Sequence, residues 1–166
     1  MDTHTTVMPF VRNPATGSIV NVLGVIHTYK ATENETAGSM SLWEAVFPPG
    51  AGAPPHTHTR EDEVFYVLSG ELLIELEGDS APHRVGPGGF FFGARRRRHA
   101  VRNVSDQPAR ALILCTPSCG LDQMFVEIEA AAADGMPAFE KLAAITAKYG
   151  VTLMSPPSRE TAVAAP

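Results

Sequence analysis

The residue types best suited to chemistry gather between Gly50 and Gly70, in the stretch GAGAPPHTHTREDEVFYVLSG. His56 and His58 are two residues apart, so on a β-strand both imidazoles point to the same face. A third histidine, His99, opens a later apolar segment and can approach the pair from across a barrel. Histidine nitrogens together with a carboxylate oxygen suit iron, nickel, cobalt, manganese, copper or zinc. The spacing therefore predicts a site for one divalent metal ion.

Three acidic residues, Glu61, Asp62 and Glu63, follow the histidine pair at once and could supply the carboxylate. Alternation along a strand favours Asp62, which shares the even register of the two histidines. The segment 59–62 also has the character of a turn or bulge, which would reset the register. Glu63 would then begin a run with Phe65 on its own face. Alternation alone leaves Asp62 and Glu63 as alternatives.

The elements that must position these side chains are short strands. The chain has 166 residues with 14 glycines and 14 prolines, and this excess lies between short apolar runs, as in turn-rich β proteins. Ser69-Gly70 predicts a hairpin between two of the runs. No internal repeat is present, so the runs indicate one antiparallel all-β sandwich or barrel. We expect strands over residues 18–23, 25–29, 40–47, 63–68, 71–77, 90–92, 99–104 and 110–116.

The period of the apolar residues changes after the β region. Leu121, Met124, Phe125 and Ile128 form one stripe of an amphipathic helix, and a second, shorter stripe begins at Phe139. Helices this short are expected to pack outside the barrel or across a dimer. The predicted organisation is an N-terminal arm (1–17), a barrel (18–118), a helical extension (119–151) and a disordered tail (152–166).

Composition and charge exclude several classes of function. Thirteen basic residues against 18 acidic ones give a net charge of −5, which does not favour nucleic acid as a partner. No apolar stretch approaches the roughly 18 residues of a membrane span, and the first residues, MDTHTT, lack the apolar region of a signal peptide. Cys115 and Cys119 do not make a disulfide framework. We expect a soluble cytoplasmic protein that acts on a small molecule.

The stretch around the histidine pair resembles the first sequence motif of the cupin superfamily. The pattern Gly50-x5-His56-x-His58-x4-Glu63-x6-Gly70 agrees with that motif at every defined position. The resemblance extends over roughly residues 38–118. Within the superfamily, the layout is similar to small single-domain cupins grouped with bacterial quercetin 2,3-dioxygenases.

The second cupin motif is only partly present. The Pro87–Phe90 segment fits it, and His99 and Asn103 have the expected spacing. Ala94 and Arg96 stand where a proline and a glycine are usual in the family. The loop that precedes the third histidine is therefore expected to differ from that of its relatives.

The resemblance implies a fold, a ligand set and partners. The fold is a double-stranded β-helix, or jelly roll, with the two helices outside it. The implied metal ligands are His56, His58, Glu63 and His99, and Glu63 is also the implied catalytic base, whose pKa apolar walls would raise. Small cupins often pair through N-terminal strands, so a homodimer is expected.

Candidate substrate contacts come from the arginine run and from aromatic residues of the predicted strands. Arg97 shares the face of His99 and lies in the run Arg95–Arg98, which is either a solvated loop or a rim that attracts an anionic substrate. Trp43 and Glu44 lie on opposite faces of one strand, so only one can line the pocket. The expected substrate contacts are Arg97, Trp43, Phe65 and Phe92, and His27, Tyr29 and Lys30 are expected near the barrel mouth.

Four protein ligands leave one or two positions open on a metal that prefers five or six. The resemblance therefore favours an oxygenase or dioxygenase that acts on a small enolic or phenolic compound, such as a flavonol or polyketide. One alternative is a non-redox isomerase, cyclase or decarboxylase that uses the same ligands. Another is a cupin that binds a small molecule without catalysis.

Overall fold

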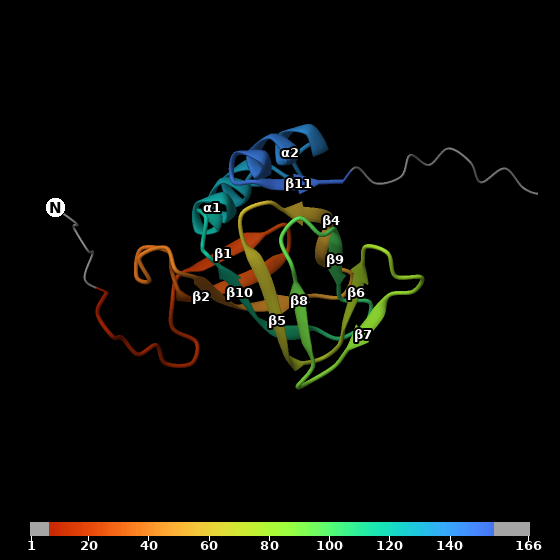
Figure 1. Cartoon of the computed structure of the whole chain (residues 1–166), viewed down its shortest axis with the longest axis horizontal. Coiled ribbons are helices and arrows are strands. Elements are labelled where there is room, and N and C mark those ends of the chain that lie inside the picture. The colour runs from red at the N-terminus through yellow and green to blue at the C-terminus, as the bar shows by residue number, and fades with distance from the viewer. Residues whose placement is uncertain (1–6, 155–166) are drawn as a thin grey trace, which may run out of the picture.

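The computed structural model describes residues 7–154 of the chain. Within that part the strands come first, followed by two helices and one last short strand near the C-terminal end (Figure 1). The first half of the β region contains β1 (Ile19–Val22), β2 (Val25–Ala31), β3 (Ser41–Phe47), β4 (Gly52–His58), β5 (Asp62–Ser69) and β6 (Leu72–Leu76). There follow β7 (His83–Val85), β8 (Phe90–Gly93), β9 (His99–Arg102), β10 (Ala109–Thr116), α1 (Leu121–Ala131), α2 (Phe139–Lys148) and β11 (Val151–Leu153).

The strands form two antiparallel sheets that enclose the core. One sheet has the order β1-β2-β3-β10-β5-β8, and the other has the order β11-β4-β9-β6-β7. Buried and partly exposed residues alternate along β2, β3 and β10, because one face of each strand packs inward. The predicted all-β jelly roll with two short helices outside it is confirmed.

The hairpin predicted at Ser69-Gly70 is wrong, because β5 and β6 lie in different sheets. Gly70 has φ +72°, and a Cβ atom there would lie 2.7 Å from the Cα of Ala109. Only glycine accommodates both the left-handed backbone and this close approach. The dipeptide is thus the crossing point from one sheet to the other.

The C-terminal segment covers one end of the β structure. Figure 1 shows α1, α2 and β11 together beside β1 and β4. β11 adds to the second sheet by pairing with β4, and it contains Thr152 and Leu153, which the sequence had assigned to a tail. The rest of that predicted tail, from residue 155, lies outside the described residues, as do residues 1–6 of the predicted arm.

The two helices of the described part of the chain are 11 and 10 residues long. Neither has the length and apolar character that crossing a membrane requires.

Candidate metal centre

Four side chains from three strands converge inside the molecule. His56 and His58 come from β4, Glu63 from β5 and His99 from β9. One potential ligand atom of each lies within 4.8 Å of those of the other three, and all four residues are buried. The structure therefore brings together the four residues that the sequence proposed as a metal site.

Strand pairing explains this convergence. His56 lies directly opposite His99 in the β4–β9 pair, while alternation along β4 turns His58 to the same side as His56. Glu63 belongs to the facing sheet, where it pairs with Gly93 of β8. Both sheets must be packed together before the fourth ligand reaches the histidines.

Hydrogen bonds at Nδ1 fix the orientation of each of the three imidazoles. The Nδ1 atom of His56 donates to the carbonyl oxygen of Pro54 at 2.7 Å, and that of His99 faces the carbonyl oxygen of Arg97 at 3.2 Å. The Nδ1 atom of His58 donates to the Glu61 carboxylate. Because these oxygens only accept, each Nδ1 carries hydrogen, and each Nε2 is the nitrogen turned toward the cluster.

Glu61, which the sequence offered only as one of three possible ligand carboxylates, contacts a histidine of the cluster instead. Its side chain is fully buried, and Oε1 accepts the hydrogen bond from His58. Oε2 has no hydrogen-bond partner among the described residues. Its position three residues after His58, across the turn between β4 and β5, is the signal that could have identified it. A carboxylate in this place fixes the orientation of a histidine ligand and raises its basicity.

The separations between donor atoms fit a divalent metal. The Nε2 atoms of His56 and His58 are 3.0 Å apart, as are Nε2 of His99 and Oε2 of Glu63. Metal–ligand bonds of about 2.1 Å at right angles place two donors about 3.0 Å apart. The donor set of three imidazoles and one carboxylate also suits first-row transition metals. The residues present therefore fit the ion that the sequence implied.

The charges of the cluster are strongly coupled. Burial lowers the pKa of His58, but the charge of Glu63 and hydrogen bonds to Glu61 and Glu63 outweigh burial and raise it to about 10. Burial raises the pKa of Glu63, but the charge and hydrogen bond of His58, with those of His99, hold it well below its usual value. The raised pKa expected for Glu63 is therefore wrong. Without a cation in the cluster, His58 therefore holds a proton beside the Glu63 carboxylate.

Asp62, the alternative carboxylate, lies apart from the cluster. Its side chain forms an ion pair with Arg95, with 2.7 Å between Oδ2 and a guanidinium nitrogen. The turn at 59–61 separates β4 from β5 and resets the alternation, so Glu63, not Asp62, shares the inward face with Phe65. The turn thus decides which carboxylate meets the histidines.

A cavity of about 230 Å³ opens beside the cluster. Its walls include His56, His58 and Glu63, and its other lining side chains are almost all apolar. The helical extension supplies a large share of these walls, which sequence reasoning missed even though it recognised the helical stripes. The lining residues from the extension and the three residues after it are Leu121, Met124, Phe125, Ile128, Phe139, Leu142, Thr146, Val151, Leu153 and Met154.

Three of the four predicted substrate contacts, Trp43, Phe65 and Phe92, are aromatic residues of the first sheet. Phe65 lines the cavity, as expected. Trp43 is fully buried and is not among the lining residues; its ring packs against Tyr29 and Phe125 with centroids 5.9 Å and 5.1 Å away. Trp43 therefore belongs to the core behind the cavity wall.

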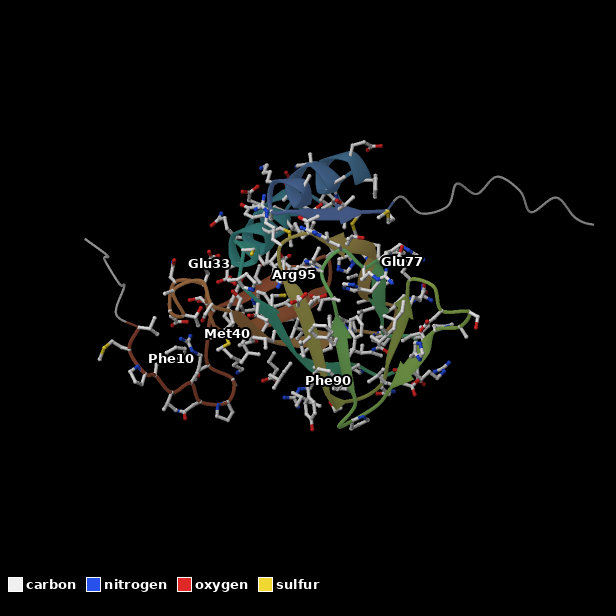
Figure 2. The ribbon with its side chains drawn as sticks, viewed as in Figure 1. Phe10, Glu33, Met40, Glu77, Phe90 and Arg95 are labelled. Atoms are coloured by element: carbon white, nitrogen blue, oxygen red, sulfur yellow. The ribbon has the colours of Figure 1, made fainter. Side chains whose placement is uncertain are left out.

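Phe92 lies on the outer face of β8, so the prediction that it contacts the substrate is wrong. In the β5–β8 pair, Phe91 lies opposite Phe65, and Phe91 is buried. Phe92 is 54% exposed, and Phe90 lies on the same outer face, at the end of the molecule away from the helices (Figure 2). Three consecutive phenylalanines carry no alternation, so only pairing with β5 reveals which one faces inward.

The arginine run lies on the surface. Arg97, expected on the face of His99, precedes β9 with its side chain 72% exposed and 3.8 Å from Glu77. Arg96 adopts φ +65°, and this turn breaks the strand alternation on which the expectation rested. Arg95, labelled in Figure 2, pairs with Asp62, and none of the four arginines is among the residues that line the cavity. The placement agrees with the solvated-loop interpretation.

Comparison with known proteins gives one family and several relatives. The family described as "Cupin domain" matches residues 43–115. "Polyketide synthase CurC" of Streptomyces cyaneus is 34% identical over 86 residues, which cover 52% of this chain and 53% of that protein. "Tetracenomycin polyketide synthase protein TcmJ" of Streptomyces glaucescens is 28% identical over 69 residues, which cover 42% of this chain and 45% of that protein. The matches thus span only about half the length of these two relatives.

Solved structures agree on the architecture. The polyketide cyclase RemF from Streptomyces resistomycificus superposes with a TM-score of 0.58 and 22% identity, covering 67% of this chain and 81% of that one. At this level of identity the likeness concerns the fold.

Proposed function

The chain contains a cupin domain, and from this premise we propose that it is a metal-dependent enzyme for a small, largely apolar enolic or phenolic substrate. The observation that carries the proposal is the buried cluster of three histidines and one glutamate at the wall of an apolar cavity. Similarity to the two polyketide synthase proteins supports a polyketide-like substrate.

The residues that would hold the metal are His56, His58, Glu63 and His99. A divalent metal there would act as a Lewis acid toward the enolic or phenolic oxygens of a substrate. Glu63 lines the cavity, so its carboxylate is placed to take up a proton from a bound molecule and return it. The apolar side chains of α1 and α2 exclude water and strengthen electrostatic interactions inside the cavity.

Two reaction classes are consistent with this arrangement. The relatives in polyketide synthesis favour a non-redox cyclisation or isomerisation, in which proton transfer and oxygen polarisation suffice. The histidine-rich donor set favours an oxygenase as the second candidate, because it also suits redox-active metals such as iron, manganese and copper.

The test combines metal analysis with measurement of turnover in the presence and in the absence of oxygen. Protein purified without added metal is expected to contain close to one first-row metal ion per chain. The variants His56→Ala and His99→Ala are each expected to lose this metal. A panel of polyketide-like enols and flavonols is then incubated in air and anaerobically. Turnover that survives without oxygen identifies the cyclase or isomerase, and turnover that stops identifies the oxygenase. Metal content that neither variant changes would exclude the proposed site, and metal-dependent binding without turnover would indicate a binding protein.

A further inference from the structure

One further ionisable side chain lines the cavity outside the candidate metal cluster. Among the lining residues of the described chain, His27 and Thr146 are the only side chains besides the cluster that carry a hydrogen-bonding nitrogen or oxygen. The hydroxyl of Thr146 donates to the carbonyl oxygen of Ala143 in its own helix, at 3.3 Å. The oxygen of Thr146 can still accept, but His27, on β2, is the one ionisable side chain among the described lining residues outside the cluster.

The hydrogen bond of His27 determines which nitrogen is available. Its Nδ1 lies 3.2 Å from the carbonyl oxygen of Val25, which can only accept, so Nδ1 carries the hydrogen. Nε2 has no hydrogen bond with any residue that the structure describes. Burial lowers the pKa of His27 to about 4, against raising contributions from the Val25 carbonyl and the charge of Glu63. The imidazole is therefore neutral near pH 7, and Nε2 presents a lone pair.

The ring of His27 is held in place by aromatic neighbours. Phe125 of α1 packs on it with centroids 4.8 Å apart, and Trp43 of β3 meets it edge-on at 6.5 Å. His27 is only 5% exposed, so its acceptor is fixed in a setting with little access to water. A ligand that enters the apolar cavity and donates a hydrogen bond would give this acceptor a partner.

We propose that His27 determines substrate specificity by accepting, through Nε2, a hydrogen bond from a hydroxyl group of the substrate. The inference rests on the proposed function. The substrate class is then an apolar molecule with at least two oxygen groups, one at the metal cluster and a second, donating hydroxyl on its skeleton. A site with a fixed buried acceptor rejects an analogue without the hydroxyl more strongly than an apolar pocket can.

The test measures binding of hydroxyflavones to zinc-loaded protein. 3-Hydroxyflavone supplies adjacent oxygens for the cluster, and derivatives with one more hydroxyl at different ring positions are each compared with their own methyl ether. For at least one position, we expect the wild type to bind the hydroxyl compound about tenfold more tightly than the ether. His27→Phe keeps a ring against Phe125 and should remove this preference, while His27→Gln, which retains an acceptor, should restore part of it.

Zinc content and melting temperature are measured for every variant, and His83→Phe, at an exposed histidine, is the matched control. A preference that survives in His27→Phe, or that His83→Phe also removes, overturns the role of His27 alone. The proposal is also overturned if the wild type prefers no hydroxyl position although 3-hydroxyflavone itself binds in a zinc-dependent manner. Absence of zinc-dependent binding by any compound counts against the proposed function as well.

Discussion

Val151 of β11 lies directly opposite His58 of β4, and Leu153 lies opposite His56 two residues further on. The strand that carries two candidate metal ligands is therefore paired on both sides, with β9 on one and β11 on the other. Val151 and Leu153 also line the cavity. The C-terminal extension thus supports the candidate metal site and shapes the space beside it.

Gly150 lets the chain turn from α2 into β11, so Gly150→Val should disturb this support. Gly150 has φ +83°, and a Cβ atom there would lie 2.6 Å from Oγ1 of Thr59. We expect a loss of about 1–3 kcal/mol in the free energy of unfolding, because a β-branched residue is strained at this φ, together with weaker metal binding. Denaturant unfolding and metal titration measure both. Gly135→Val is the control, since Gly135 also has positive φ but no atom within 4 Å of its Cβ position; equal effects on metal binding in the two variants would contradict the prediction.

The identity of the carboxylate ligand can be tested with a pair of conservative variants. Glu63→Gln should abolish stoichiometric metal binding, because it removes the anionic donor among the three histidines. Asp62→Asn should keep the metal, since Asp62 pairs with Arg95 on the surface. Metal analysis after purification and calorimetric titration with zinc provide the measurements. Retained stoichiometry in Glu63→Gln with loss in Asp62→Asn would reverse the assignment.

Glu61→Gln tests the carboxylate that holds His58. The substitution preserves size but removes the charge that accepts from Nδ1, so metal affinity is expected to fall by about 10- to 100-fold. The melting temperature of the metal-free protein is also expected to fall, because the change removes one partner of the buried His58–Glu61 pair. Competition with a fluorescent zinc chelator measures the affinity, and Glu75→Gln, at an exposed position, is the control. Unchanged affinity would show that Glu61 does not position the ligand.

Metal binding should release protons near neutral pH. The pKa of His58 is raised to about 10 without a cation, whereas a ligand nitrogen must give up its proton to bind metal. Affinity is therefore expected to increase with pH across the neutral range, and calorimetry in buffers of different ionisation enthalpy should detect the released protons. Binding with no proton release would contradict this pKa assignment.

The same shift predicts the stability of the metal-free protein. His58 has a higher pKa in the folded than in the unfolded chain, so its proton stabilises the fold fully below pH 6.5, the unfolded value. This contribution is lost as pH rises toward about 10. Unfolding measured between pH 6.5 and 10 should show a decline that His58→Gln reduces; an equal decline in that variant would assign the effect to other groups.

The sequence by itself was sufficient to identify the metal cluster as a set. An interval of two residues places His56 and His58 on one side of any strand, whatever the rest of the chain does. His99 was already a candidate from the residues, the motif resemblance selected Glu63, and apolar runs separated by glycine and proline indicated the all-β fold. These features depend on local periodicity and on short spacing.

Only the tertiary structure decided which side chains face the cavity. Phe92 was expected at the pocket wall and Arg97, by alternation, on the face of His99, but pairing with β5 turns Phe91 inward, and the turn at Arg96 takes Arg97 to the surface. The role of Glu61 depends on a turn that brings it back to His58. The helical stripe was recognisable, yet its position over the cavity depends on β11 pairing with β4. The physical reason is that strand register and long-range packing join residues far apart in the chain, and a one-residue change of register reverses the face of every side chain that follows.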